Sequence, residues 1–467
     1  MMTAAERLAH FVAGLDIVSI PQAARDYAKL CLLDTLGIAL AGHHEASTRA
    51  ARSVAQQQGG APQATLFVEG AKVPATQAAL VNGTAAFSHN FTDTTLSCII
   101  HAGPVAVPAA LAMGEYVNAS GSQVLTAIVA GYDIMTRVGN AINAGSARMA
   151  HHRKGYHPTA TCGVFGAAAL AAKLLDLSHA GIVHSLGVAG SFAGGLSESL
   201  TDGTDTWRAH GGMAAYNGLL AALLARDGLT GPRGVFDGER GFCTAFTDGH
   251  YDASALDPQP EDHLLVLDSA FKLHNTAHVW ALPLDALAIL RAEHGFGVAD
   301  IEEMIVTFPQ NWTAIMDDPT GATYAPVNYA QATNNLRYCL AAGLHDGIVY
   351  LDQFDDAHLH NPAILDTARR ITPRPDAEFG RIFATTDQAP THLEVILKSG
   401  AHYQLRVDYP RGSPPNPATR DELEAKFDAL AAPILPTAQI TPLKERIFTL
   451  EEVGNIGELT SLLSRTS

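Results

Sequence analysis

The sequence predicts a mainly α-helical protein that carries a smaller α+β part. Apolar residues recur at the spacing of amphipathic helices through residues 1–263 and again after residue 411. Alternation of apolar and polar residues, which is typical of half-buried strands, occurs instead within residues 264–410. We therefore predict a large all-helical domain from residues 1–263 and 411–467, and an inserted α+β lid domain from residues 264–410. A cleft between two such domains is a natural place for a site.

The first four predicted helices cover residues 23–40, 74–91, 104–118 and 121–142. Gly42 follows the first of them as a typical stop signal. Asp133 and Arg137 lie four residues apart in the last one. That spacing predicts an ion pair on the surface or between helices, worth about 0.2–0.5 kcal/mol.

Three further helices are expected at residues 160–177, 180–195 and 211–229, and all three are crowded with Ala and Gly. Small residues let helices approach closely, so these segments are expected to form the buried centre of a bundle. Strands are expected at residues 263–274 and 301–309, and a hairpin at 391–410 around Ser399 and Gly400. Helices are also expected within residues 331–347, 421–435 and 443–463.

The composition is that of a compact globular protein, with 47% hydrophobic and 16% charged residues. A formal net charge of -17 argues against nucleic-acid and anionic-membrane partners, which select basic faces. The five cysteines form no CxxC pair, which favours reduced core thiols in a cytoplasmic protein. The first residues do not read as a secretory signal, and no stretch approaches the roughly 20 apolar residues of a membrane span.

The chain contains none of the common nucleotide-binding, nucleophile-elbow or zinc-protease motifs. The stretch "HNTAH" places His274 and His278 four residues apart, which would allow a shared metal if the segment were helical. No third ligand lies nearby in sequence, and the flanking residues resemble a strand. We therefore expect no metal and no cofactor.

The stretch "KGYHPTATCGVFGAA" places Tyr156, His157 and Pro158 directly before one of the small-residue helices. Proline is well suited to the first helical position, because its missing N–H would have no helical partner there. His157 would then lie at the N-cap, where the helix dipole favours a carboxylate and lowers the pKa of the ring. The residues alone leave two interpretations open: an ordinary capping histidine, or a site for proton transfer to an acidic small molecule.

Other titratable candidates are spread along the chain, and local sequence cannot bring them together. They occur in "SHNFTDTTLSCIIHAGP", "DGTDTWRAHGG" and "AFKLHNTAH", and are Asp93, His101, Arg208, His210, Lys272 and His278.

At these residues the chain resembles the MmgE/PrpD family over essentially its whole length. The segments that carry the resemblance are "LCLLDTLGIALAG", "NGTAAFSHNFTDT", "HAGPVAVPAALA", "GYDIMTRVG", "GYHPTATCGVFGAAALAAKLLDL", "GSFAGGLSESLTDGTDTWRAHGGMAAYNGLLAALLARDGLTGP" and "GSPPNPATRDELEAKF". The family is known for a helical domain with an α+β lid, and homodimers are common. Its members include 2-methylcitrate dehydratases, cis-aconitate decarboxylases and an iminodisuccinate epimerase. Their shared chemistry moves a proton at carbon next to a carboxylate, without metal or organic cofactor.

The resemblance implies roles for particular residues. Asp93 falls on the family's loop aspartate, His101 on the following histidine, and His157 on the histidine of the Gly-aromatic-His-Pro motif. Lys272 falls on the lysine that opens the lid, His278 near the histidine after it, and Tyr338 on the lid tyrosine. Arg208 stands one position from the family's usual lysine, Asn275 replaces an expected proline, and the Trp-rich loop of the dehydratases is missing.

These departures favour an epimerase acting on iminodisuccinate or a similar dicarboxylate. An epimerase needs two acid–base groups on opposite faces of one carbon. We expect His157 or Tyr156 on one face and Lys272 or Tyr338 on the other, with Asp93 and His101 orienting or relaying. Cationic donors stabilise the charge that develops next to the carboxylate, so Arg208, with His210 and His278, is expected to bind substrate. Two alternatives remain: a dehydratase or cis-aconitate decarboxylase, or a non-catalytic dicarboxylate-binding protein.

Overall fold

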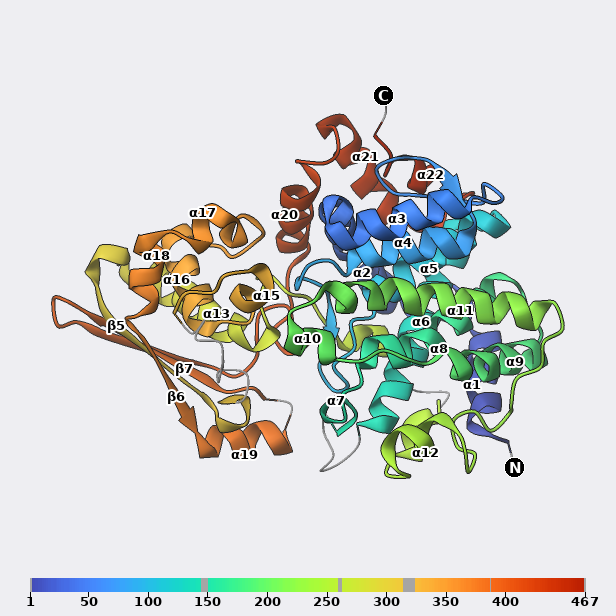
Figure 1. Cartoon of the computed structure of the whole chain (residues 1–467), viewed down its shortest axis with the longest axis horizontal. Coiled ribbons are helices and arrows are strands. Elements are labelled where there is room, and N and C mark those ends of the chain that lie inside the picture. The colour runs from blue at the N-terminus through green and yellow to red at the C-terminus, as the bar shows by residue number, and fades with distance from the viewer. Residues whose placement is uncertain (1, 144–149, 259–262, 314–323, 387, 466–467) are drawn as a thin grey trace. The chain divides into compact units, whose positions relative to one another are not determined.

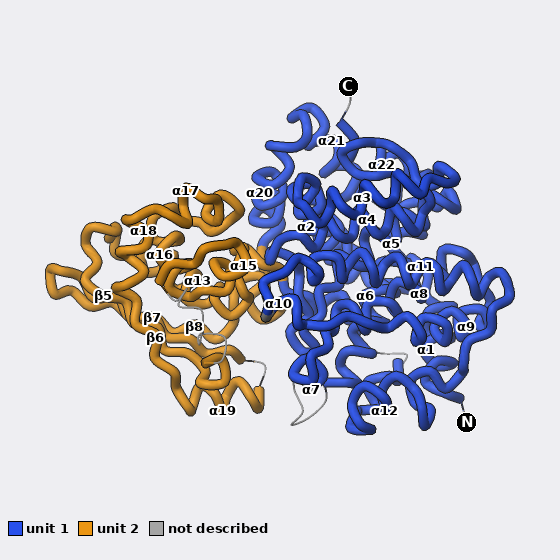
Figure 2. Tube along the Cα trace, in the orientation of Figure 1, with its two compact units in different colours: residues 1–270, 419–467 blue, residues 271–418 orange. Residues whose placement is uncertain are grey.

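A computed structural model of the chain describes residues 2–143, 150–258, 263–313, 324–386 and 388–465. The chain divides into two compact units, which Figure 2 shows in different colours. Unit 1 comprises Met1–Ala270 and Thr419–Ser467, and unit 2 comprises Phe271–Ala418. The expected boundaries were 263/264 and 410/411. The first division falls later because Ser269 and Ala270 pair with Thr94 and Thr95 of unit 1.

Unit 1 is built mainly from helices that both ends of the chain supply. Its helices are α1 (Ala4–Gly14), α2 (Gln22–Ala41), α3 (Ala46–Gln58), α4 (Ala75–Ala86), α5 (Gly103–Val117), α6 (Gly121–Ile142), α7 (Ala150–Arg153), α8 (Pro158–Leu174), α9 (His179–Ala189), α10 (Glu198–Asp202), α11 (His210–Arg226), α12 (Phe242–Thr247), α20 (Arg420–Ala431), α21 (Thr437–Phe448) and α22 (Gly457–Ser461). The helix expected at 23–40 is confirmed as α2, with Gly42 at its C-cap.

Small residues bring the central helices of unit 1 close together, as their sequence indicates. Helices α8 and α11 run side by side (Figure 1), and a Cβ on Gly218 of α11 would lie 2.3 Å from the Cβ of Ala167 in α8. A Cβ on Gly212 would lie 2.1 Å from the carbonyl oxygen of Leu80 in α4. Only glycine permits these crossings, and they bring the start of α11 against α4.

The expectation of an all-helical domain is wrong in detail, because unit 1 contains two short antiparallel strand pairs. Strand β1 (Ala64–Thr65) pairs with β2 (Lys72–Val73), and β3 (Thr94–Thr95) pairs with β4 (Ser269–Ala270). The strand expected at 263–274 is largely absent among these described residues. Residues Leu265–Asp268 form a 3₁₀ turn, and only Ser269–Ala270 are extended and paired.

Unit 2 combines helices with one four-stranded sheet. Its elements are α13 (His278–His294), β5 (Ile301–Pro309), α15 (Tyr329–Thr333), α16 (Leu336–Asp346), α17 (Asp356–Leu359), α18 (Pro362–Ala368), β6 (Ile371–Asp376), α19 (Ala377–Thr385), β7 (Thr391–Leu397) and β8 (His402–Val407). The strand order is β6-β5-β7-β8, with β5 and β6 parallel and the other pairs antiparallel. The expected strand at 301–309 and the hairpin at 391–410 are confirmed.

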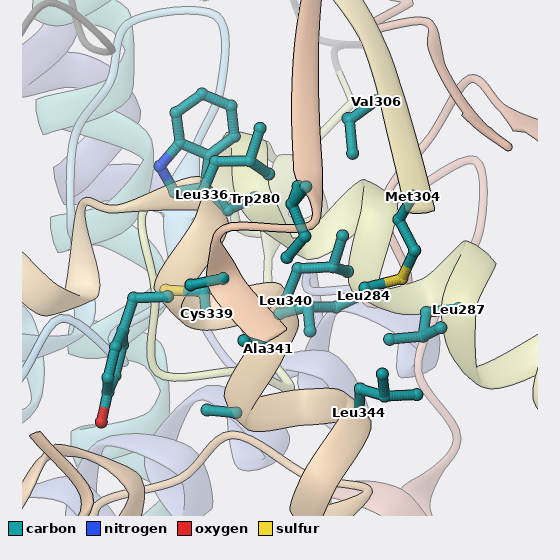
Figure 3. Close-up of a cluster of buried hydrophobic side chains, with 14 of the residues drawn as sticks. Trp280, Leu284, Leu287, Met304, Val306, Leu336, Cys339, Leu340, Ala341 and Leu344 are labelled. Carbon is teal, nitrogen blue, oxygen red and sulfur yellow. The ribbon is translucent and has the colours of Figure 1, made fainter. Parts of the chain in front are cut away.

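The core of unit 2 lies between its helices and the sheet. Figure 3 shows side chains from α13, β5 and α16 meeting there, among them Trp280, Leu284, Leu287, Met304, Val306, Leu336, Leu340 and Leu344. Sequence analysis missed strand β6, which contains Pro373 and Pro375. Proline cannot donate to a ladder, and β6 accommodates it because it lies at the edge of the sheet.

Two expectations about individual side chains have different outcomes. All five cysteines are buried free thiols, as expected for core residues. Asp133 and Arg137 do form an ion pair, with 2.6 Å between Oδ1 and Nε. The pair lies within α6, however, and is neither on the surface nor between helices, because the Asp133 side chain is fully buried. Its other oxygen accepts the backbone N–H of Leu265.

Candidate active site

His157 lies at the start of α8, and Pro158 is the first residue of that helix, as the sequence predicts. The backbone N–H of His157 donates to the carbonyl of Gly195, at 3.0 Å. The imidazole turns toward His210, at the start of α11, rather than toward the helix that it precedes. His157 is the N-cap residue of α8, as expected, but its side chain makes no capping hydrogen bond to the helix.

The rings of His157 and His210 are joined by a hydrogen bond, with 2.9 Å between their Nδ1 atoms. Both side chains are buried, with 8% and 4% of their surface exposed. Burial lowers the pKa of His210 to about 4. Burial, reinforced by His210, holds the pKa of His157 well below its ordinary value. Both rings are therefore neutral at pH 7, and each has one nitrogen that can donate and one that can accept.

His101 completes a group of three imidazoles. Its ring centroid lies 6.5 Å from that of His157, and both rings pack against Phe87 at the end of α4. Nδ1 of His101 donates to the carbonyl oxygen of Asp93, at 2.9 Å. A neutral ring with its proton on Nδ1 keeps Nε2 as its basic nitrogen. The backbone N–H of His101 donates to the Thr159 hydroxyl, so the loop is fixed to the first turn of α8.

Asp93 contacts one member of this group, His101, through its backbone carbonyl. Its carboxylate accepts the N–H of Gly103 at the start of α5, at 3.0 Å, and the Tyr132 hydroxyl, at 2.8 Å. The side chain is 1% exposed. Burial, and then the nearby Asp34 carboxylate, raises the pKa of Asp93 to about 7. Asp93 thus contacts the His101 ring through its backbone carbonyl, and its buried carboxyl titrates near neutral pH. Its orienting role stays a prediction.

A buried ion pair lies beside Asp93. Nζ of Lys426 in α20 is 2.7 Å from Oδ1 of Asp34 in α2, and both side chains are 1% exposed. The ammonium also donates to the Phe91 carbonyl, at 2.8 Å, and lies 3.8 Å from the centre of the Phe91 ring. Asp34 and Asp93 are two buried carboxyl groups near a single lysine. Because Lys426 is paired with Asp34, a negative charge on Asp93 is disfavoured, and its pKa is raised. This pair was not found from the sequence, since α2 and α20 lie at opposite ends of the chain.

Arg208 is already engaged by acceptors of its own unit. Its guanidinium donates to the Ser88 carbonyl and lies 3.0 Å from Asp205 and 3.6 Å from Glu45. It also lies over the Trp207 ring. Two carboxylates offset its charge, which favours a structural role in fixing the segment before α11. Its role as a substrate ligand stays a prediction.

Tyr156 belongs to an aromatic cluster beside the histidines. Its ring stacks on His151, with 4.9 Å between centroids, and packs against Phe246 of α12. His151 in turn hydrogen bonds the Thr161 hydroxyl of α8, at 2.9 Å. These contacts fix the Tyr156 ring against His151 and Phe246, and its catalytic role stays a prediction.

Lys272, His278 and Tyr338 belong to unit 2, whereas the three histidines described above belong to unit 1. Lys272 is 3% exposed, and His278 is the first residue of α13. Tyr338 is fully buried in the core of unit 2 and donates its hydroxyl to the Gln353 carbonyl, at 2.6 Å. Burial also raises the pKa of Tyr338, which keeps the phenol protonated at neutral pH. Its catalytic role stays a prediction.

His274 and His278 do not share a helix face, because α13 begins at His278. His274 instead lies 3.5 Å from Asp285. Within the described ranges there is no group of three or more His, Cys, Asp or Glu side chains that could hold a metal ion. The helices of those ranges are also too short or too polar to cross a membrane.

Sequence reasoning missed Phe87, Tyr132, Asp34 and Lys426. A phenylalanine or tyrosine within an apolar helix carries no local signal of a site. A lysine inside a helix such as α20 is normally read as solvated, and only its burial shows otherwise.

Comparison with known proteins places the chain in a family. Residues 6–254 match the MmgE/PrpD N-terminal domain and residues 275–447 match the MmgE/PrpD C-terminal domain. The chain is 27% identical to the cis-aconitate decarboxylase-like protein oryM of Aspergillus oryzae, over 98% of this chain and 96% of that protein. It is 27% identical to the human cis-aconitate decarboxylase over 99% and 95%, and 24% identical to that of Aspergillus terreus over 98% and 95%. Because the N-terminal family model alone covers more than half of the chain, the protein belongs to the MmgE/PrpD family.

Proposed function

We propose that the protein is a cofactor-independent lyase that acts on a small tricarboxylate, with decarboxylation of cis-aconitate as the favoured reaction. The observation that carries the proposal is the buried, neutral pair formed by His157, at the start of α8, and His210, at the start of α11, with His101 beside it. The names of the relatives support this assignment over the epimerase expected from the sequence.

Decarboxylation of such a substrate needs one proton delivered to carbon. When CO2 leaves, the electrons of the broken C–C bond remain on a carbon that must be protonated. An imidazolium can supply that proton, whereas a neutral ring cannot do so efficiently at pH 7. The site therefore has to bind a proton before the chemical step.

The substrate itself can bring about this protonation. A tricarboxylate next to the rings favours their charged form, because a nearby negative charge raises the pKa of an imidazole. The first turn of α8 adds a partial positive charge at the same place, which favours a bound carboxylate. Substrate and proton are thus expected to bind together, and the proton is then consumed with the loss of CO2.

The other sequence-based assignments remain proposals in this scheme. His157 delivers the proton. His101, whose Nδ1 is held by the Asp93 carbonyl, stacks against the His157 ring and orients the substrate. Lys272, His278 and Arg208 are candidates for binding the remote carboxylates. A homodimer is expected from the family resemblance.

The test is proton NMR of the purified full-length protein in D2O with cis-aconitate, 2-methylcitrate and iminodisuccinate, each in a separate sample. We expect cis-aconitate to lose CO2 and give a five-carbon dicarboxylate that carries one deuterium. His157→Gln should lower the rate by about 10²-fold or more, the usual size of an acid–base contribution. The exposed His250, replaced by Ala, is the matched control and should retain the wild-type rate.

Other outcomes would replace the proposal rather than adjust it. Deuterium entering iminodisuccinate with interconversion of its stereoisomers would restore the epimerase. Loss of water from 2-methylcitrate would assign the dehydratase. Thermal stabilisation by all three acids without turnover would indicate a binding protein.

A further inference from the structure

The hydrogen bond between His157 and His210 has a consequence for how the histidine group handles protons. A bond between two ring nitrogens holds one proton, so one Nδ1 donates and the other accepts. Because Nδ1 of His157 is occupied in this way, Nε2 is the nitrogen of His157 that can exchange a proton with a substrate. His210 therefore acts on a bound substrate indirectly, through its hydrogen bond to His157.

We propose that His210 is a positioning residue that binds Nδ1 of His157, so that the two rings act as one acid–base unit with Nε2 of His157 as its exchanging atom. This assignment differs from the substrate-binding role expected from the sequence. It deepens the proposed function and rests on it for the identity of the reaction, but not for the hydrogen bond itself.

The proton balance of the unit follows from its four ring nitrogens. The protonated pair carries one proton on Nε2 of His157, one between the two Nδ1 atoms, and one on Nε2 of His210. Transfer of the first proton to the carbon that loses CO2 leaves a neutral pair, in which His157 donates from Nδ1 to His210. One proton taken from solvent restores the starting state. Sharing the positive charge over two rings assists the uptake of that proton in a buried place.

The surrounding structure fixes the geometry of the pair. His210 is the first residue of α11, whose approach to α4 depends on Gly212. His157 is held through its backbone N–H by Gly195, and its ring is stacked on Phe87. The titratable groups that act on His157 are His210 itself, His101 from the loop before α5, and His151 and His152 from α7. All are imidazoles, so each opposes protonation of His157, and a negatively charged substrate reverses this effect.

The first test is spectroscopic and needs no turnover. In ¹⁵N-histidine-labelled full-length protein at neutral pH, the pair predicts one Nδ1 ring proton that is coupled through its hydrogen bond to the ¹⁵N nucleus of a second histidine ring. The Nδ1 proton of His101 lacks this coupling, because its acceptor is a carbonyl oxygen. The coupled signal should disappear in both His210→Ala and His157→Gln, and should persist in the control His250→Ala. A signal that survives His210→Ala would overturn the inference even if the lyase activity is confirmed. Conversely, absence of lyase activity in a wild-type protein that shows the signal would count against the proposed function alone.

The second test separates positioning from substrate binding. His210→Ala should lower kcat by about 10²-fold and leave KM within about threefold, because its partner is His157 rather than the substrate. His210→Asn, whose amide can occupy the place of Nδ1, should recover at least tenfold of that loss. His210→Gln, whose amide reaches farther, should recover less, and it replaces the alanine variant if that protein does not fold.

The pH profile adds a readout that a purely structural role would not change. In the wild-type protein, the pH profile of kcat should report one apparent pKa that belongs to the coupled pair, and His210→Ala should shift that apparent pKa. A raised KM with unchanged kcat, or equal losses of kcat in all three His210 variants, would refute the positioning role.

Discussion

Removing the ammonium of Lys426 should strongly destabilise unit 1. In Lys426→Met the shape of the side chain is largely kept, but Asp34 loses an ion pair of 2.7 Å and the Phe91 carbonyl loses its donor at 2.8 Å. Both members of the ion pair are 1% exposed, so water cannot replace the lost partner. Breaking one side of such a buried pair costs about 3–5 kcal/mol, because an uncompensated charge remains.

The double variant Asp34→Leu/Lys426→Met should recover most of this loss. With both charges removed, no desolvated ion remains, and the net cost should be about 1 kcal/mol or less relative to wild type. The assay is urea unfolding of the full-length protein at pH 7, followed by circular dichroism, with the four proteins compared as a double-mutant cycle. Lys154→Met is the matched control. Its pair with Asp248 has side chains that are 36% and 74% exposed, so it should cost less than about 1 kcal/mol.

Two results would refute this reasoning. If Lys426→Met cost no more than Lys154→Met, the ammonium of Lys426 would not be compensating a buried charge. If the double variant lost as much stability as the sum of the single variants, the two side chains would act independently. The Asp34–Lys426 ion pair would then not account for the raised pKa of Asp93.

Three further predictions follow from the site and its surroundings. Gly195 has a φ of +144°, and a Cβ added to it would lie 2.3 Å from the Cβ of Ala160. Gly195→Ala should therefore displace His157, lower kcat and reduce the free energy of unfolding by about 1–3 kcal/mol. Gly194→Ala is the control and should do neither, because a Cβ there would meet open space. The pKa of Asp93 is raised from 3.8 to about 7, so between these values the folded state keeps a proton that the unfolded state has lost. This carboxyl therefore makes the fold less stable as the pH rises from about 4 to about 7, and Asp93→Asn should flatten the unfolding free energy over that range. Burial lowers the pKa of His89 from 6.5 to about 3, so on acidification this imidazole is protonated in the unfolded chain before it is protonated in the folded one. The free energy of unfolding should therefore fall between pH 6.5 and 4, and it should fall less steeply in His89→Gln. An unchanged kcat in Gly195→Ala, or unchanged pH slopes in the other two variants, would contradict these expectations.

Local patterns were enough to predict most of the individual elements. The boundaries of α2, α5 and α6 follow from apolar spacing and from stop signals such as Gly42. Pro158 marked the start of α8 for the reason that the sequence gives, a missing N–H at a position where none is needed. Strand β5 and the β7–β8 hairpin follow from runs of alternating or continuous apolar residues.

Pairing between distant segments was not predictable in the same way. The short strand β4 exists because Ser269 and Ala270 meet Thr94 and Thr95, and β6 exists because it can lie at a sheet edge. Neither segment has a strong propensity of its own. Asp133 and Arg137 had the right spacing for an ion pair, but their burial depends on what packs over α6.

The sequence by itself determined the helical start at His157, the small-residue helices around it, and the family resemblance that nominated Asp93 and His101. Only the tertiary structure decided that His157 bonds to His210, that Asp93 turns its carboxyl into the interior, and that Tyr338 is a core residue of unit 2. The physical reason is that the sequence reports the local preferences of the backbone. The protonation and role of a side chain depend on its burial and its partners, which distant parts of the chain supply.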